Sequence, residues 1–278
     1  MKAVEVSGLT KHFESFTLDG VTFSADSGCI IGLVGENGAG KSTTIKLILN
    51  MLKKDSGSVK LFGKDNSLAD MNEIGVVFDE CCFHEALCAN EINKIMKNFY
   101  TKWNEKEFFR LCQKFDLPLK RKIKEYSRGM KMKISIAAAL SHNARLLILD
   151  EPTSGLDPVV RDEILDIFYD FISDENRTII ISSHIVSDLE KICDYIAFMH
   201  KGKMILFEEK DTLLGDCCII NCAESDFEKI DKNDIIGFRK TQSGISAVIR
   251  KSGVPQNSYV QPVSLEDLFV YMIRGCEL

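Results

Sequence analysis

Long hydrophobic runs are missing from this sequence of 278 residues. A helix that crosses a bilayer needs about 20 consecutive apolar residues, and no stretch approaches that length. Residues 1–7 carry charge early and lack the apolar core of a secretory signal peptide. We therefore expect a chain that neither spans a membrane by itself nor is secreted, so that any role at a membrane comes through a partner.

An excess of basic residues is also missing, since 35 Lys and Arg stand against 41 Asp and Glu, a net charge of −6. Proteins that bind nucleic acid in general are normally basic, so this balance argues against that class while leaving room for a local basic patch. No internal repeat is found. A hydrophobic content of 45% is ordinary for a soluble globular protein with a proper core.

The paired cysteine spacing of a zinc finger is absent, although the chain has ten cysteines. Several lie in apolar strand or helix patterns, where a free cysteine behaves as a small hydrophobic residue. The cluster of Cys81, Cys82, His84 and Cys88 has metal-ligand residue types in one short stretch, without a second pair. We expect reduced thiols rather than a metal site or a disulfide framework.

Residues 35–43, GENGAGKST, follow the pattern G-x-x-x-x-G-K-S of a phosphate-binding P-loop. Apolar residues 29–34 before them predict a buried strand and residues 44–51 after them predict a helix, which is the context that the motif requires. The glycines let backbone N–H groups cradle phosphate oxygens, and the helix dipole favours the anion. Lys41 is expected to reach the β- and γ-phosphates, and the Ser42 hydroxyl to ligate Mg²⁺. The residues expected to bind nucleotide here are Gly35, Asn37, Gly38, Ala39, Gly40, Lys41, Ser42 and Thr43.

Two more predicted strands bring polar residues to the same edge of a sheet. Apolar residues 146–149 are followed by Asp150 and Glu151, and the β-branched stretch 178–183 is followed by His184. In open α/β sheets, ligands bind at the carboxyl ends of the strands. We expect Asp150 to act on Mg²⁺, Glu151 to orient or deprotonate an attacking water, and His184 to contact the γ-phosphate.

Phe13 and Asp79 are candidates with an ordinary alternative each. Phe13 lies in residues 1–34, which read as strands and turns with a turn at Asp19 and Gly20, and its ring could stack on a nucleotide base. Spacing alone favours a core Phe in a β-subdomain. Asp79 follows the short buried strand 74–78 and either reaches the cleft or is a loop charge.

Residues 84–145 change to helical periodicity, with stripes at 91–99 and 105–115 and a long helix at 131–140. They predict an all-helical insertion in an α/β protein. From residue 211 the chain restarts with strand patterns and a last helix capped by Ser264. We expect a domain of residues 1–210 with the insertion inside it, followed by a small α+β domain of residues 211–278.

Five motifs in this order resemble the nucleotide-binding subunit of ABC transporters, over residues 1 to about 210. They are the P-loop, the helical insertion, Ser-x-Gly at 127–129, LILDEPTSGLD at 147–157 and Ser-Ser-His at 182–184. The resemblance implies that Phe13 stacks on adenine, which reverses the preference for a core Phe. It implies that Asp150, Glu151 and His184 are the Walker B Asp, the catalytic Glu and the switch His. Residues 127–130 match the signature loop, with Ser127 and Gly129 as nucleotide ligands, and residues 154–157 match the D-loop.

The resemblance also implies the architecture and the partners. The fold is an α/β P-loop NTPase with a RecA-like, mainly parallel sheet, an N-terminal antiparallel β-subdomain, an inserted α-helical subdomain and a small C-terminal α+β appendage. ATP and Mg²⁺ are the cofactors. Two ATPase subunits, identical or different, face head to tail with ATP between one P-loop and the other chain's signature loop. They power a separate transmembrane permease from the cytoplasmic face of the membrane.

Two motifs depart from the usual pattern of the family. The signature loop of the family usually reads Ser-Gly-Gly-Gln, and a Gln usually follows the strand that corresponds to residues 74–78. Arg128 and Met130 replace the second and fourth signature residues, and Asp79 replaces the Gln. A hydroxyl and a backbone N–H remain at Ser127 and Gly129, while the added charge of Asp79 near Mg²⁺ leaves open whether it holds a metal-bound water. The Ser-Arg-Gly-Met signature resembles the bacterial ABC-2 exporters, including bacitracin-resistance, multidrug and acetoin-operon ATPases.

Two other functions are possible for a chain with these motifs, and the sequence favours an exporter ATPase over both. A soluble ABC protein of ribosomes or DNA repair usually carries two ATPase units or a long coiled coil, whereas this chain has one unit and an acidic balance. A nucleotide-binding regulator without turnover is disfavoured because Lys41, Ser42, Glu151 and His184 are all present.

Overall fold

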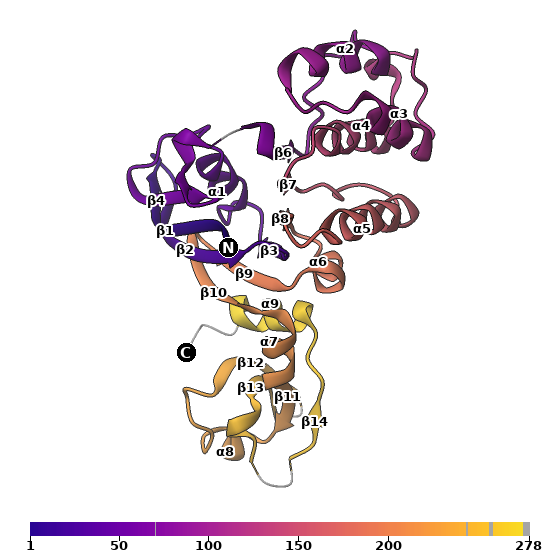
Figure 1. Cartoon of the computed structure of the whole chain (residues 1–278). Helices are drawn as coiled ribbons and strands as arrows, with labels where there is room; N and C mark the ends of the chain where they lie inside the picture. The colour runs from indigo at the N-terminus through magenta and orange to yellow at the C-terminus, as the bar shows by residue number, and fades with distance from the viewer. Residues whose placement is uncertain (70, 243, 256–257, 275–278) are drawn as a thin grey trace.

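The computed structural model describes residues 1–69, 71–242, 244–255 and 258–274 (Figure 1). Its central sheet has six strands in the order β10-β9-β3-β8-β7-β6, of which β10 alone runs antiparallel to its neighbour. The strands are β3 (Ile30–Gly35), β6 (Ile74–Val77), β7 (Leu146–Asp150), β8 (Thr178–Ser183), β9 (Tyr195–His200) and β10 (Lys203–Glu209). The mainly parallel, RecA-like sheet predicted from the sequence is therefore confirmed.

Both faces of this sheet are covered, which explains why β3, β7 and β8 are buried along their whole length. Ile30 and Val34 of β3 pack in the same core cluster as α5 (Pro158–Ile172) and α6 (Val186–Ile192). Ile31 and Leu33 point to the other face and pack with α1 (Lys41–Ile48) and the N-terminal sheet. Alternating side chains of β3 thus pack in two hydrophobic cores, one on each face of the sheet, and this packing fixes the position of the strand end.

The N-terminal antiparallel sheet has the order β2-β1-β4-β5. Its strands are β1 (Lys2–His12), β2 (Thr17–Asp26), β4 (Ser56–Leu61) and β5 (Lys64–Asp65), and the short 3₁₀ helices η1 (Asn66–Leu68) and η2 (Met71–Glu73) follow them. The predicted turn at Asp19 and Gly20 is wrong, because β2 runs through both residues. The backbone N–H of Gly20 donates to Thr10 Oγ1 of β1 at 3.1 Å, so the two strands stay connected there. The chain reverses earlier, where Phe13 N donates to Phe16 O at 2.8 Å.

The helical insertion forms a separate layer beyond β6 and β7 (Figure 1). It contains α2 (Ala89–Phe99), α3 (Glu105–Lys114), the 3₁₀ helix η3 (Ile123–Glu125) and α4 (Arg128–Leu140). The predicted helices are confirmed, but α4 begins three residues before the predicted start at Lys131. The reason is the N-cap: the Ser127 hydroxyl accepts a hydrogen bond from Met130 N at 3.2 Å, so that the signature residues form the first helical turn.

The C-terminal residues fold as a third sheet on the side of the central sheet opposite to the helical insertion (Figure 1). The sheet has the order β12-β13-β11-β14. Its elements are α7 (Lys210–Asp216), β11 (Cys217–Cys222), α8 (Glu224–Phe227), β12 (Ile235–Thr241), β13 (Gly244–Arg250), η4 (Lys251–Gly253), β14 (Val260–Gln261) and α9 (Leu265–Arg274). Helix α9 joins the two parts, because Phe269 stacks on Phe198 of β9 with 5.7 Å between ring centroids and Leu265 N donates to Glu190 Oε2 at 2.8 Å. The predicted small α+β appendage is therefore present.

Candidate functional site

The P-loop connects the end of β3 to the start of α1, as the motif requires. A Cβ atom on Gly35 would lie 2.5 Å from the carbonyl oxygen of Met199, so only glycine allows β9 to approach this closely. Gly40 is the N-cap residue directly before α1, and its φ of +108° is a conformation that favours glycine. The loop therefore has the backbone geometry that presents N–H groups to an anion.

Lys41 is buried beneath this loop and makes two strong contacts. Its Nζ donates to the carbonyl oxygen of Gly35 at 2.7 Å and lies 3.3 Å from Oε1 of Glu151. The ammonium group is thus fixed between the loop and the carboxylate that follows β7. Lys41 therefore contacts both the P-loop backbone and Glu151, so that two predicted site residues form an ion pair.

Asp150, at the end of β7, is only 4% exposed and accepts two hydroxyl hydrogen bonds on Oδ1. Ser42 Oγ donates at 3.0 Å and Ser182 Oγ, from β8, donates at 2.6 Å. Mg²⁺ prefers oxygen ligands and is usually held by one or two protein groups, with phosphates and waters completing the shell. The adjacent hydroxyl of Ser42 and carboxylate of Asp150 fit that requirement.

Glu151 is anchored at both its backbone and its side chain. Its N–H donates to Ser182 O and to Ser182 Oγ, each at 3.1 Å, and its φ of +53° is unusual for a residue with a side chain. Its Oε2 accepts from His184 N at 3.2 Å and lies 2.6 Å from His184 Nδ1. Strained backbone of this kind persists where the surroundings hold it in place, and here the held group is a carboxylate between Lys41 and His184.

Phe13 follows β1 and its ring is 43% exposed, so it is not the core Phe that spacing alone favoured. The neighbouring ring of Phe16 lies against the P-loop, since a Cβ on Gly40 would be 3.2 Å from Phe16 Cζ. Asp55 fixes the end of β1 by accepting from Lys11 Nζ at 2.8 Å and His12 N at 2.7 Å. These hydrogen bonds hold the pKa of Asp55 well below its usual range. The exposed Phe13 ring lies 6.2 Å, between ring centroids, from Phe16, whose ring in turn lies against the P-loop.

Asp79 is the one predicted metal residue that lies apart from the others. It is exposed in the segment after β6, and no hydrogen bond joins it to Ser42 or Asp150, all three of which the structure describes. Together with Glu80 and Glu85 it lines a groove of about 490 Å³ against the start of α4, here called the Asp79 groove. Asp79 thus lines this groove, and its contact with Mg²⁺ stays a prediction.

Ser127 and Gly129 sit at the start of α4 and face the segment that leads into α5. A Cβ atom on Gly129 would lie 3.7 Å from Val160 Cγ1 and 3.8 Å from Leu156 Cδ2, ordinary packing distances. Asp157 caps α5 by accepting from Val160 N at 3.1 Å, as the Asp-Pro sequence predicts. The signature loop therefore packs on the D-loop of its own chain rather than on its own P-loop.

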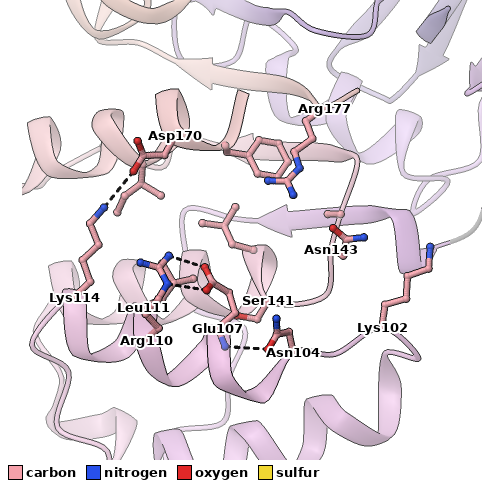
Figure 2. A pocket seen from close by; sticks show the side chains of 14 residues that line it. Lys102, Asn104, Glu107, Arg110, Leu111, Lys114, Ser141, Asn143, Asp170 and Arg177 are labelled. Carbon is pink, nitrogen blue, oxygen red and sulfur yellow. Dashed lines mark hydrogen bonds and ion pairs between the residues drawn. The ribbon is translucent and has the colours of Figure 1, made fainter. Parts of the chain in front are cut away.

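A second wide pocket, of about 490 Å³, lies between α3, the end of α4 and α5, and contains none of the predicted site residues (Figure 2). Arg110 donates to both carboxylate oxygens of Glu107, at 2.7 and 2.6 Å, and Lys114 lies 3.3 Å from Asp170 (Figure 2). Most of the charge in this pocket is therefore neutralised within it, and we assign it no part in nucleotide chemistry.

Ser182 is the functional residue that the sequence analysis missed. It binds the side chain of Asp150 and the backbone of Glu151, so that one β8 residue aligns both carboxylates. The available signal was the polar pair Ser182 and Ser183 at the end of an otherwise apolar, fully buried strand. The fold and this arrangement of phosphate loop, lysine, hydroxyl and two carboxylates define the class of P-loop NTPases.

Comparison with known proteins narrows the class. The family described as ABC transporter matches residues 18–154. "Lantibiotic transport ATP-binding protein SrtF" of Streptococcus pyogenes is 37% identical over 211 residues, which cover 75% of this chain and 91% of that protein. "Bacitracin transport ATP-binding protein BcrA" of Bacillus licheniformis is 34% identical over 209 residues, covering 73% and 68%. A solved structure described as "Structure of ATP binding subunit of ABC transporter" superposes with a TM-score of 0.69 at 28% identity, covering 76% of this chain and 91% of that one.

The chain belongs to the ATP-binding subunits of ABC transporters, and within them it is similar to the bacterial ABC-2 exporter branch. It binds nucleotide and is an ATPase. These relatives favour a transporter ATPase over the soluble ribosomal or DNA-repair alternative. Within the described residues, no helix is long and apolar enough to cross a membrane.

Proposed function

We propose that this chain hydrolyses ATP to power export through a separate membrane permease. The observation that carries the proposal is the convergence of Lys41, Asp150, Glu151 and His184, from three separate segments, within hydrogen-bond or ion-pair distance of one another or of Ser42. The lantibiotic and bacitracin transport proteins among the relatives support a peptide antibiotic, drug or lipid-like substrate. A nucleotide regulator without turnover would not need Glu151 aligned in this way.

Each side chain has a distinct role in this proposal. Lys41 neutralises charge on the β- and γ-phosphates, and Glu151 accepts a proton from the attacking water or orients it. His184 holds Glu151 and would donate to the γ-phosphate. Ser42 and Asp150 would hold Mg²⁺, which when bound neutralises developing charge on the phosphates. The exposed ring of Phe13 stacks on the adenine.

The position of the signature loop supports a second ATPase subunit. Gly129 packs near Leu156 and Val160 of its own chain, and the Ser127 hydroxyl caps α4, so neither residue is bonded to the P-loop of that chain among the described residues. A second subunit arranged head to tail would place its own ATP there. ATP then holds the two subunits together and hydrolysis releases them, a ligand-driven population shift.

An apolar groove offers the permease a docking surface. Val77, Phe78, Phe83, Met96 and Tyr100 line it, between β6 and the helical insertion. At its open end Met71 and Phe99 are exposed to solvent. Exposed apolar side chains that border a groove mark an interaction site, and a short amphipathic helix is the element that fills such a groove. We propose that the permease supplies this helix and thereby holds the chain at the cytoplasmic face of the membrane.

The proposed division into residues 1–210 and 211–278 lies one residue inside α7, which begins at Lys210 directly after β10 ends at Glu209. Residues 211–278 have their own small core, which includes Cys218, Ile220, Ala247 and Ile249. This separate core supports treating them as a second domain, although Cys217, Val248 and residues of α9 pack in the core of the ATPase domain. Its contribution to the transporter is distinct from ATP chemistry, since no predicted site residue lies in it.

The test is affinity purification from membranes with this chain as bait, with and without ATP. The proposal expects a multi-helix permease in the eluate. Phe99→Asp should lose the permease while keeping ATP turnover. Tyr259→Asp is the matched control, because Tyr259 is 76% exposed and Phe99 is 75% exposed, and only Phe99 borders the apolar groove. Recovery of ribosomes or repair proteins without a membrane protein would contradict the transporter proposal.

A further inference from the structure

The guanidinium of Arg128 lies on the D-loop of its own chain. A Cβ atom placed on Gly155 would come within 2.6 Å of Nη1 and 2.8 Å of Cζ of Arg128, so the guanidinium occupies the space that any side chain at this position would need. Gly155 also has a φ of +67°, where a side chain is strained. The backbone conformation therefore favours glycine at position 155, and a side chain there would displace the Arg128 guanidinium from its present place.

Arg128 has no competing partner that explains this placement. In the part of the chain that the structure describes, its guanidinium forms no hydrogen bond or ion pair. The residue is exposed, and its other side borders the Asp79 groove, where Asp79, Glu80 and Glu85 supply carboxylates. The guanidinium of Arg128 thus packs against Gly155 although carboxylates of the Asp79 groove lie on its other side. This position makes Arg128 the residue that touches both the groove and the D-loop.

The D-loop is closely connected to Glu151. Ser154 N donates to the carbonyl oxygen of Glu151 at 3.2 Å, and Leu156 N donates to that of Thr153 at 3.3 Å. These hydrogen bonds close two overlapping turns, which connect Gly155 to Glu151, four residues earlier in the sequence. Because Thr153 is fully buried, the segment has little freedom to absorb a displacement of Gly155 before it reaches the carboxylate.

We propose that Arg128 is a positioning residue for ATP hydrolysis, which seats its guanidinium on Gly155, fixes the D-loop and thereby aligns Glu151 of the same chain. This inference rests on the proposed role of Glu151. Arg128 acts on the alignment of a catalytic group and not on the nucleotide bound to its own P-loop. Its loss therefore lowers the turnover number and leaves the KM for ATP nearly unchanged.

The first experiment is a double-mutant cycle between Arg128→Ala and Gly155→Ala, with ATP turnover as the readout. Misplacement of a catalytic group by about 1 Å can cost roughly a hundredfold, so each single variant should lose about ten- to a hundredfold in kcat. The double variant should be no worse than the poorer single variant, because both remove the same contact. Additive losses would overturn the proposal, as would an unchanged kcat in Arg128→Ala.

Gly20→Ala is the matched control for backbone strain. Gly20 has a φ of +65°, close to that of Gly155, but a Cβ atom there would meet nothing within 4 Å. Its loss of thermal stability should be the same with Arg128 or Ala at position 128, and its turnover should equal that of the wild type. The loss at Gly155 should become smaller when Arg128 is absent. If Arg128→Ala does not fold, Arg128→Gln takes its place in both cycles.

Mixed dimers separate this role from a direct contact with the ATP of a second subunit. Arg128→Ala is mixed with Lys41→Ala, and turnover is compared with the average of the two separate proteins. The positioning role predicts no gain, because the only intact P-loop then belongs to the chain that lacks Arg128. A gain toward about a quarter of wild-type activity, from random pairing of subunits, would show action across the dimer and overturn the proposal. Full activity of Lys41→Ala by itself would instead refute the proposed function.

Discussion

Ser182→Ala tests the alignment of the proposed Mg²⁺ site with the removal of one oxygen atom. The Ser182 hydroxyl donates to Asp150 Oδ1 at 2.6 Å, and Asp150 is 4% exposed, so water does not readily replace the lost donor. A hydrogen bond to a charged group contributes about 1.5–3 kcal/mol. At 1.4 kcal/mol per factor of ten, this corresponds to a loss of about ten- to a hundredfold in apparent Mg²⁺ affinity.

The assay is ATP turnover as a function of Mg²⁺ concentration. The curve for Ser182→Ala should shift to higher Mg²⁺, and most of the activity should return at saturation, because Glu151 N retains the carbonyl oxygen of Ser182 as an acceptor. Ser183→Ala is the control, since Ser183 is equally buried on β8 but its hydroxyl accepts from Ile185 N at 2.9 Å. An unshifted curve for Ser182→Ala, or the same shift in Ser183→Ala, would refute the reasoning.

Three further outcomes follow from the structure. Phe13→Ala should weaken ATP binding, measured by titration calorimetry, by about 1–3 kcal/mol for the lost base stacking, while Phe13→Tyr should not. Asp55→Asn should lower the melting temperature at neutral pH. The pKa of Asp55 is depressed in the folded state, so its stabilisation is present above its usual pKa of 3.8 and is lost as the pH falls below that value; the gap between variant and wild type should close there. Burial raises the pKa of Cys112 to about 12, so an alkylating reagent at pH 8 should spare it in the folded protein and label it after unfolding, as peptide mass spectrometry would show.

Much of the site could be predicted because its residues stand at strand ends. Residues 35–43, Asp150, Glu151 and His184 all follow apolar stretches, and parallel strands bring such positions to one edge of the sheet. The contacts among Lys41, Glu151 and His184 were not predicted, because they depend on side-chain directions and on the left-handed backbone of Glu151.

Other features depend on contacts between distant segments, which a sequence pattern does not specify. Asp19 and Gly20 have the residue types of a turn, but a hydroxyl from β1 satisfies the Gly20 N–H and β2 continues. Arg128 meets Gly155 across two separate segments, so no local pattern reveals it. Asp79 was expected near the metal on family resemblance, and the structure places it in the groove beside α4.

The most direct test of the central claim is ATP turnover by Glu151→Gln, compared with the wild type. Loss of a general base costs about a hundred- to ten-thousandfold, so turnover should nearly cease while ATP stays bound. In the proposed head-to-tail dimer unhydrolysed ATP holds the two subunits together, so gel filtration of the variant with ATP and Mg²⁺ should show a dimer that the wild type does not retain. Turnover at the wild-type rate would contradict the assignment of Glu151 and the hydrolysis mechanism built on it.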